Sequence, residues 1–124
     1  MMNELNTNNF KSLRVWQESH FLVISIYKNT KHFPKEEIFG LSSQMRRAAV
    51  SVTSNIAESY GRRGNKEKIQ FFFISLGSIH ELDSQLLIAR DINYISKEEY
   101  IILEGQIIKI IALLHAIIKS TKSM

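Results

Sequence analysis

The sequence contains no cysteine, one proline and five glycines. Without cysteine the chain has no disulfide framework, no thiol nucleophile and no cysteine-ligated metal, and such a composition suits the reducing cytoplasm, where we expect this protein. The scarcity of proline and glycine leaves few positions at which helices must end. No apolar run reaches the length of a membrane span and the polar start is unlike a signal peptide, so no membrane segment is expected.

The chain has 124 residues, of which 44% are hydrophobic, and this is enough for one folded domain with its own core. The first residues are polar and without helical periodicity, so we expect a frayed tail over residues 1–9 and a single domain over residues 10–124. The net charge is +4 and the isoelectric point is near 9.4, which favours an anionic partner.

Apolar residues recur at helical spacing in four segments, and no segment alternates with the period of a strand. We predict helices over residues 10–32, 39–60, 66–91 and 97–119. The inward face predicted for the first helix consists of Trp16, His20, Val23 and Tyr27, and that of the second of Leu41, Met45, Ala48, Val52 and Ile56. Ser96 and Glu99 form a capping box before the fourth helix. Four helices with short connections predict an all-α, antiparallel up-down-up-down bundle.

Three of these helices carry more apolar surface than one monomer buries easily. Phe71 to Ile74 are consecutive, so at about 100° per residue they point to every side of the third helix. Phe21 and Leu22 lie outside the predicted inward stripe of the first helix, and the fourth helix is apolar over nearly half of its circumference. Such patches favour a homo-oligomer. The alternative is a monomer whose long lysine side chains cover the excess.

An antiparallel bundle brings together the start of the first helix, the connection between the second and third, and the end of the fourth. These regions contribute Lys11, Arg14, Arg62, Arg63, Lys66, Lys68, Lys119 and Lys122. Lys66 and Lys68 open a helix, where the macrodipole disfavours cations, and this favours a phosphate-binding surface over a merely solvated end. Arg46 and Arg47 are second-choice candidates for nucleic-acid binding, because they are also placed to join an inter-subunit network.

Patterns typical of catalysis are missing. The GRRG sequence at 61–64 matches the GXXG loop of KH domains, but the sheet of a KH fold is not predicted, so we interpret it as a helix cap and tight turn. No histidine follows a glutamate at the spacing of di-iron bundles, and there is no Walker loop, zincin motif or Ser-His-Asp arrangement. Polar residues on apolar helices are interpreted as fixing helix register. We therefore predict a protein that is not an enzyme and has no cofactor or metal.

Motifs distributed from about Phe10 to Leu114 resemble those of one protein family. They are Leu13-x-Val15-Trp16-Gln17-x-Ser19, Tyr27-x-x-Thr30-x-x-Phe33-Pro34, Phe39-Gly40-Leu41-x-x-Gln44-x-Arg46-Arg47-Ala48, Asn55-Ile56-Ala57-Glu58, Gly61-Arg62 and Gly77-Ser78-x-x-Glu81-Leu82-x-x-Gln85-Leu86. The chain resembles the ribosomal-protein-like four-helix bundles encoded in intervening sequences of bacterial large-subunit ribosomal RNA genes. Their relatives include the accessory variability protein of diversity-generating retroelements. Ser59-Tyr60 is a departure, because the family often has glycine after the glutamate.

The resemblance implies a bundle that assembles as a homo-oligomeric ring, with a pentamer expected, and it implies association with nucleic acid. The retroelement relatives bind nucleic acid and a reverse transcriptase. Our leading hypothesis is a non-enzymatic, oligomeric bundle that binds RNA or DNA non-specifically through its basic end. The alternative is a protein–protein adaptor that docks an acidic partner such as a reverse transcriptase.

Overall fold

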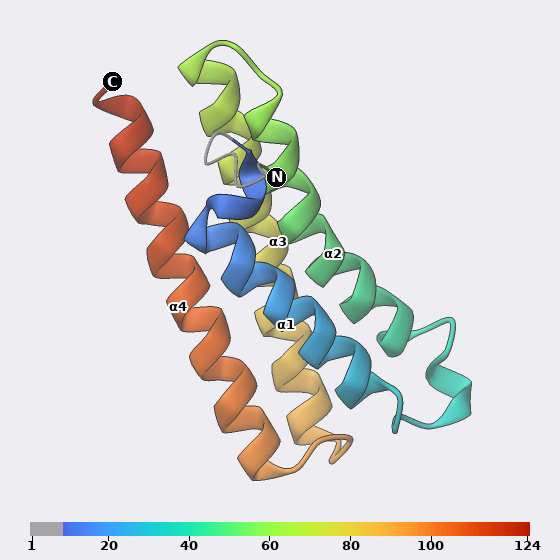
Figure 1. Cartoon of the computed structure of the whole chain (residues 1–124). Coiled ribbons are helices and arrows are strands. Elements are labelled where there is room, and N and C mark those ends of the chain that lie inside the picture. Colours follow the sequence, from blue (N-terminus) through green and yellow to red (C-terminus); the bar gives the residue numbers. More distant parts are fainter. Residues whose placement is uncertain (1–8) are drawn as a thin grey trace, which may run out of the picture.

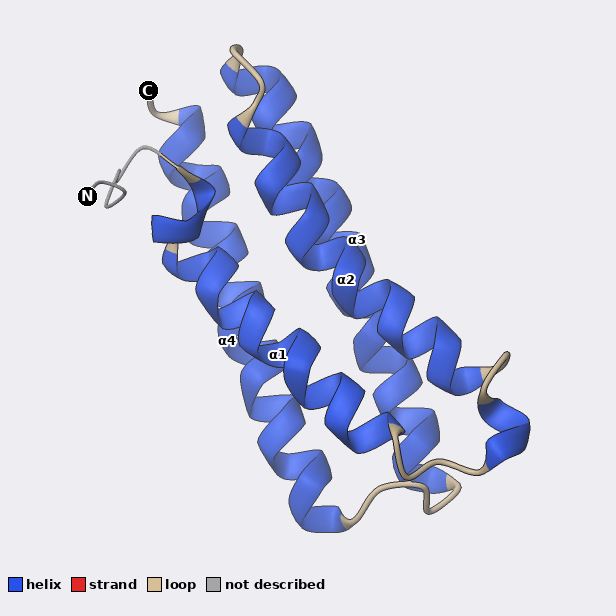
Figure 2. Cartoon of the chain, turned by 45° about the vertical axis from the view of Figure 1, so that its right-hand side comes forward, coloured by secondary structure: helices blue, strands red, loops and turns tan. Residues whose placement is uncertain are grey.

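The computed structural model describes residues 9–124, and these form an antiparallel four-helix bundle (Figures 1 and 2). The helices are η1 (Phe10–Ser12), α1 (Arg14–Thr30), η2 (Lys35–Glu37), α2 (Leu41–Tyr60), α3 (Asn65–Asp91) and α4 (Lys97–Lys122), where η denotes a short 3-10 helix. The predicted all-α, up-down-up-down fold is confirmed, and residues 9–124 contain no strand. Residues 1–8 of the predicted tail lie outside the described residues. Each long helix packs against two others, in the cyclic order α1, α2, α3, α4.

The connection from α1 to α2 is held by the carboxylate of Glu37. Its Oε1 accepts a hydrogen bond from the backbone N–H of Leu41 at 3.0 Å, which caps α2, and its Oε2 accepts one from the Tyr94 hydroxyl at 2.8 Å. Both bonds lower the pKa of the Glu37 carboxyl, the Leu41 bond most. Because Tyr94 lies in the connection from α3 to α4, this carboxylate joins the two connections at one end of the bundle (Figure 1).

The turn from α3 to α4 combines two capping motifs. Asn93 adopts a left-handed φ of 66°, and the N–H of Tyr94 donates to the carbonyl of Ala89 at 2.8 Å, which is the Schellman ending of α3. The capping box predicted for α4 is confirmed, because Ser96 Oγ accepts from the Glu99 N–H at 3.0 Å and Glu99 Oε1 accepts from the Ser96 N–H at 2.8 Å. Together these motifs satisfy the free backbone groups at both helix ends.

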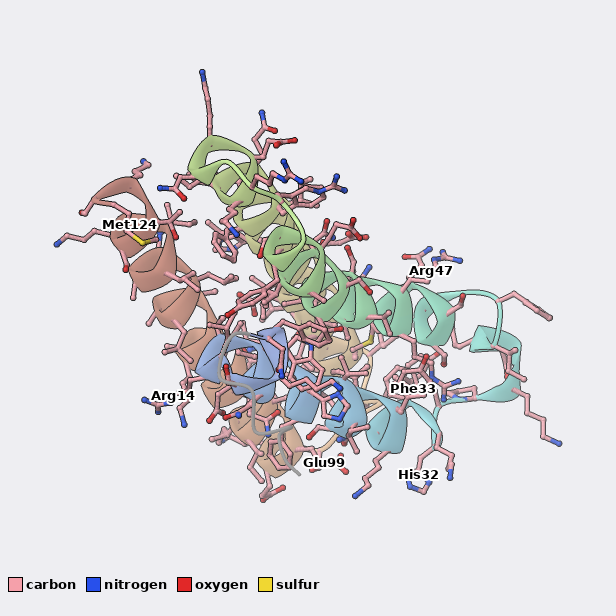
Figure 3. All side chains as sticks on the ribbon, turned by 45° about the horizontal axis from the view of Figure 1, so that its top comes forward. Arg14, His32, Phe33, Arg47, Glu99 and Met124 are labelled. Atoms are coloured by element: carbon pink, nitrogen blue, oxygen red, sulfur yellow. The ribbon has the colours of Figure 1, made fainter. Side chains whose placement is uncertain are left out.

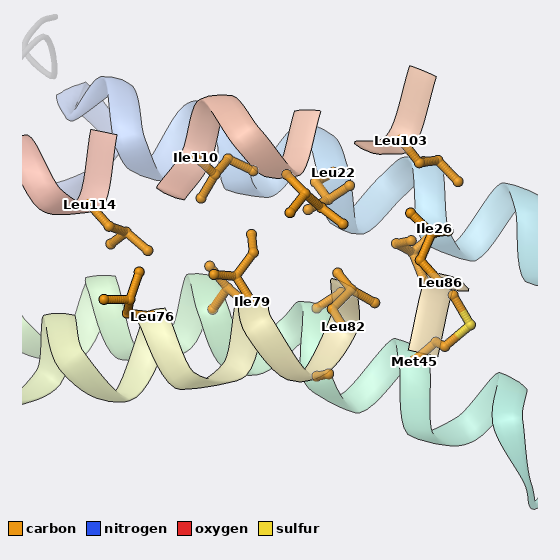
Figure 4. Packing of buried hydrophobic residues seen from close by; sticks show 14 of the residues in the cluster. Leu22, Ile26, Met45, Leu76, Ile79, Leu82, Leu86, Leu103, Ile110 and Leu114 are labelled. Atoms are coloured by element: carbon orange, nitrogen blue, oxygen red, sulfur yellow. The ribbon is translucent and has the colours of Figure 1, made fainter. Parts of the chain in front are cut away.

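The hydrophobic core runs along the bundle axis and takes one face from each long helix (Figure 4). The predicted face of α2 is confirmed, with only Leu41 less than fully buried. The face predicted for α1 was wrong by about one residue. Its buried residues are Val15, Ser19, Leu22, Ile26 and Thr30. Leu22, which was predicted to lie outside the inward stripe, is therefore a core residue, whereas its neighbour Phe21 is 59% exposed, as predicted.

α2 and α3 share the most extensive contact in the bundle, and small polar residues bring them close together. The hydroxyls of Ser51 and Ser78 are 2.8 Å apart, and Ser75 Oγ donates to the carbonyl of Val52 at 2.8 Å. A side chain larger than serine at these positions would push the helices apart. The run of small residues in α2 therefore allows the close packing of α2 on α3.

Helix α4 corrects one expectation drawn from the sequence. It is long and apolar enough to cross a membrane by length and composition, although no such segment was expected. The helix also provides much of the core, through Leu103, Ile107, Ile110, Leu114 and Ile118. A core helix meets the same criteria as a membrane span. Its outward face keeps three isoleucines that are at least 60% exposed, namely Ile101, Ile102 and Ile108.

Candidate nucleic-acid interface

Six of the eight predicted basic residues come together at one end of the bundle. They belong to the α2–α3 connection, the first turn of α3 and the last turn of α4, which lie at the same end in Figure 1. We call this set the basic end: Arg62, Arg63, Lys66, Lys68, Lys119 and Lys122. Lys11 and Arg14 do not join it. α1 has only 17 residues against 27 in α3, so it begins well short of that end, and Arg14 points outward from the side of the bundle (Figures 1 and 3).

Three cations of the basic end are held against aromatic rings. Arg62 pairs with Glu58 at 2.7 Å, and its guanidinium lies 4.9 Å from the centre of the Phe71 ring. Lys68 Nζ lies 5.6 Å from the centre of the Tyr60 ring and donates to the Ser59 carbonyl at 3.5 Å. These contacts hold both side chains near the turn, and the ion pair with Glu58 offsets the charge of Arg62.

Lys122 makes the third of these contacts. Its Nζ lies 5.8 Å from the centre of the Phe73 ring, which links the end of α4 to α3. Phe73 is 48% exposed, so one face of the basic end presents an aromatic ring to solvent beside a cation. Rings in such positions are the usual platforms for unpaired bases.

The other three cations of the basic end are exposed and unpaired. The charged side chains of Arg63, Lys66 and Lys119 have no hydrogen bond, ion pair or ring contact with any residue in the described part of the chain. The N-cap of α3 is Gly64, which offers no side chain, so the first N–H groups of α3 receive no side-chain cap. The positive end of the α3 dipole therefore adds to the charge of Lys66. In contrast, α4 begins with a capping box and two acidic residues.

The GRRG turn uses ordinary backbone geometry. Gly61 has a φ of −82°, and no glycine within residues 9–124 has a positive φ. The N–H groups of Gly61 and Arg62 donate to the carbonyls of Glu58 and Ser59, both at 3.1 Å, and so close the end of α2. The prediction of a helix cap and tight turn is confirmed. Arg63, in the middle of this turn, is exposed.

Arg46 and Arg47 lie near the opposite end of α2 and line a cleft of about 700 Å³. Arg46 Nε donates to Thr30 Oγ1 at 2.9 Å, and its guanidinium lies 4.8 Å from the centre of the Tyr27 ring. Arg47 is exposed, points outward (Figure 3) and has no partner among the described residues. We call this the α2 cleft; its other walls include Ile38, Gln44, Ala48, Val50, Ser51 and Glu81.

A pair of carboxylates between α3 and α4 was missed by the sequence analysis. Asp83 Oδ1 and Glu104 Oε1 are buried and have no donor among residues 9–124. Burial, and then the hydrogen bond with Asp83, raise the pKa of Glu104 to about 7, while nearby Arg90 opposes the shift. One proton shared between the two carboxylates supplies the missing donor. No group of three or more histidine, cysteine or acidic side chains that could hold a metal ion occurs in the described residues.

Residues 11–116 match the family model of the 23S rRNA-intervening sequence protein. The chain belongs to this family. The resemblance seen in the distributed motifs is thus confirmed over most of the sequence. A solved structure with a similar fold, described as a protein of unknown function from the S23 ribosomal protein family of Bacteroides thetaiotaomicron, is 26% identical with a TM-score of 0.76. The similarity covers 85% of this chain and 98% of that one. No curated protein matches the sequence.

Proposed function

We propose that this intervening-sequence protein is a non-enzymatic, cytoplasmic bundle that binds nucleic acid through its basic end. The observation that carries the proposal is the group of three exposed, unpaired cations, Arg63, Lys66 and Lys119, beside the uncapped start of α3. Cations without intramolecular partners are available to displace counterions from phosphates. Contacts with phosphate alone give little sequence specificity, so binding is expected to be non-specific.

The exposed ring of Phe73 favours single strands over duplexes. It lies next to Lys122, so a flexible strand is able to place a phosphate on the lysine and stack a base on the ring. Bases inside a duplex are already stacked and do not reach such a platform. We therefore expect the tighter binding to single-stranded RNA or DNA.

The test is fluorescence anisotropy with a labelled single-stranded RNA and a DNA duplex of equal length across a salt series. The variant is Arg63→Glu/Lys66→Glu, which leaves the Arg62 contacts with Glu58 and Phe71 untouched. The matched control is Lys28→Glu/Lys31→Glu, because these two exposed lysines end α1 and carry the same charge change. We expect the variant to lose affinity and to reduce the salt slope by about 1.4, or about 0.7 for each lost contact with a single strand.

The control should retain most of the affinity, since its charges lie at the opposite end of the bundle. No binding of either probe at low salt would refute a nucleic-acid role. Equal losses in the variant and the control would mean that net charge, and not the basic end, drives the binding.

We further propose that the protein assembles as a homo-oligomeric ring, with a pentamer as the expected size. The support is the apolar surface left uncovered on one monomer, such as Phe21 and Ile101, which are 59% and 60% exposed. A ring repeats the basic end in every subunit, and weak contacts then act together. Sedimentation velocity measures the mass; a monomer at all accessible concentrations would refute the assembly.

A second candidate function is a protein adaptor whose basic end docks an acidic partner such as a reverse transcriptase. It is favoured by the locked cations Arg62 and Lys68, which present a rigid surface of the kind that folded partners recognise. Both functions give salt-sensitive binding. Testing Arg63→Glu/Lys66→Glu separately against nucleic acid and against the protein partner distinguishes them.

A further inference from the structure

The connection from α1 to α2 carries a phenylalanine that is almost fully exposed to solvent. Phe39 is 96% exposed, and its neighbour Ile38 is 56% exposed. The segment is held in place, because the N–H groups of Ile38 and Gly40 donate to the carbonyls of Lys35 and Glu37 at 3.1 and 3.0 Å. The Glu37 carboxylate adds its bonds to Leu41 and Tyr94. The apolar ring therefore projects from a turn with defined geometry, as a docking residue does.

The same segment is acidic on its exposed side. Glu36 precedes the two apolar residues, is exposed and has no ion pair within residues 9–124. The segment 36–39 thus combines a free carboxylate with a projecting ring. We call it the docking turn.

The α2 cleft has the complementary chemistry. Its lining includes apolar Ala48 and Val50 and the ring of Tyr27, together with the unpaired guanidinium of Arg47. Ile38 of the same subunit's docking turn and Glu81 also line it, so the cleft lies directly beside that turn. The contacts of Arg46 with Thr30 and Tyr27 keep that wall rigid. A cleft of about 700 Å³ is larger than a phenyl side chain and has room for Phe39 together with part of its turn.

We propose that the α2 cleft of one subunit receives the docking turn of a second copy of this chain. Phe39 fills the apolar part of the cleft, and Glu36 pairs with Arg47 at its rim. The argument for a second copy is complementarity within one sequence: the acidic, apolar turn and the basic, apolar cleft are both present and both unoccupied on every subunit. Buried aromatic anchors flanked by a charge pair are the usual centre of a protein interface. The inference rests on the proposed self-association and names the contact that produces it.

The test uses sedimentation velocity over a concentration series to measure the mass of the assembly for the wild type and four variants. Phe39→Ala and Arg47→Glu each remove one side of the contact, and both residues are exposed, so folding is preserved and is checked by helical circular dichroism. Glu36→Arg/Arg47→Glu exchanges the two charges within one chain. Met124→Ala is the matched control, because it truncates a large exposed apolar side chain that lies at the other end of the bundle, outside the cleft.

We expect each of Phe39→Ala and Arg47→Glu to raise the subunit dissociation constant at least about tenfold, as loss of an interface anchor does. The charge exchange should restore most of the affinity lost in Arg47→Glu, and Met124→Ala should change the affinity by less than about threefold. An oligomer that is insensitive to Phe39→Ala, or one that loses as much with Met124→Ala, would overturn the docking contact and leave self-association standing. A wild-type monomer would overturn both. Nucleic-acid binding is measured separately, and its result tests neither the docking contact nor self-association.

Discussion

The carboxylate pair formed by Asp83 and Glu104 makes the stability of this protein depend on pH in a predictable direction. Glu104 has a pKa of about 7 in the folded chain, against 4.5 for an ordinary glutamate. Because the folded pKa is the higher one, the stabilising effect of the proton is complete below about pH 4.5 and is lost as the pH rises through 7. Above that pH Glu104 is charged, and its charge lies beside Asp83, whose electrostatic effect raises the pKa of Glu104.

Replacing Glu104 by glutamine removes this dependence. The glutamine amide donates to Asp83 as the protonated acid does, but it does not ionise. The full displacement of the Glu104 pKa corresponds to about 3 kcal/mol, and because the side chain is only partly buried, solvent screening reduces this to about 1–2 kcal/mol. We therefore expect Glu104→Gln to be more stable than the wild type by about 1–2 kcal/mol at pH 8 and to show no gain near pH 4.5.

The assay is urea denaturation between pH 4.5 and 8.5 at one protein concentration, since assembly also contributes to stability. Asp83→Asn should give a similar gain, because it removes the other charge, and the double variant should add little to either single one. Glu98→Gln, an exposed residue on the same helix, is the control and should show no such gain. A constant difference in the free energy of unfolding between Glu104→Gln and the wild type from pH 4.5 to 8.5 would refute a shared proton.

Three further results are expected. Gly40→Ala should lower the melting temperature by a few degrees, because a Cβ at this position lies 2.7 Å from Glu37 Oε1 and displaces the carboxylate that caps α2. Ile79→Ala should cost about 3 kcal/mol in urea denaturation, because this side chain is fully buried, whereas Ile108→Ala should cost much less in a monomer. Phe73→Ala should weaken binding of single-stranded RNA by about 1–3 kcal/mol in anisotropy titrations and leave duplex binding nearly unchanged.

The inward face of α2 was predictable from the sequence and that of α1 was not. The difference arises because two residues with hydroxyl side chains are buried in α1. In α1 the large residues Trp16 and Tyr27 dominate the apolar pattern, yet Ser19 and Thr30 are buried instead. Ser19 Oγ donates to the carbonyl of Val15 and Thr30 Oγ1 to that of Ile26, each at 2.7 Å, so neither hydroxyl needs water. The spacing of apolar residues does not predict the burial of Ser19 and Thr30, because these residues are polar and their hydroxyls are satisfied within the helix itself.

The composition of the basic end was predictable only as far as chain topology determines it. Arg62 and Lys119 lie at the same end of the bundle because α2 ends where α3 begins and α4 runs antiparallel to α3. Arg14 lies away from the basic end because α1 is ten residues shorter than α3, with 17 residues against 27, so the two helices do not reach the same end. The pair of Asp83 and Glu104 depends on the register between two helices, and no local pattern in the sequence reports that register.

The arginine pair near the start of α2 and the pair just after its end share an arrangement that separates structural from binding roles. In each pair the first guanidinium is stacked on an aromatic ring, Arg46 at 4.8 Å from Tyr27 and Arg62 at 4.9 Å from Phe71. The second arginine of each pair, Arg47 or Arg63, is exposed and has no partner in the described residues.

Charge reversal at the first member of either pair therefore damages the monomer, and its effect on binding has no simple meaning. Reversal at the second member leaves the fold intact. If Arg47 serves assembly and Arg63 serves nucleic-acid binding, Arg47→Glu should lower the mass of the assembly while each monomer keeps its salt dependence of nucleic-acid binding. Arg63→Glu should reduce that salt dependence while the mass of the assembly stays unchanged. Arg47 lies near the start of α2 and Arg63 lies beyond its end, so the two sites are far apart and their effects should be additive in the double variant.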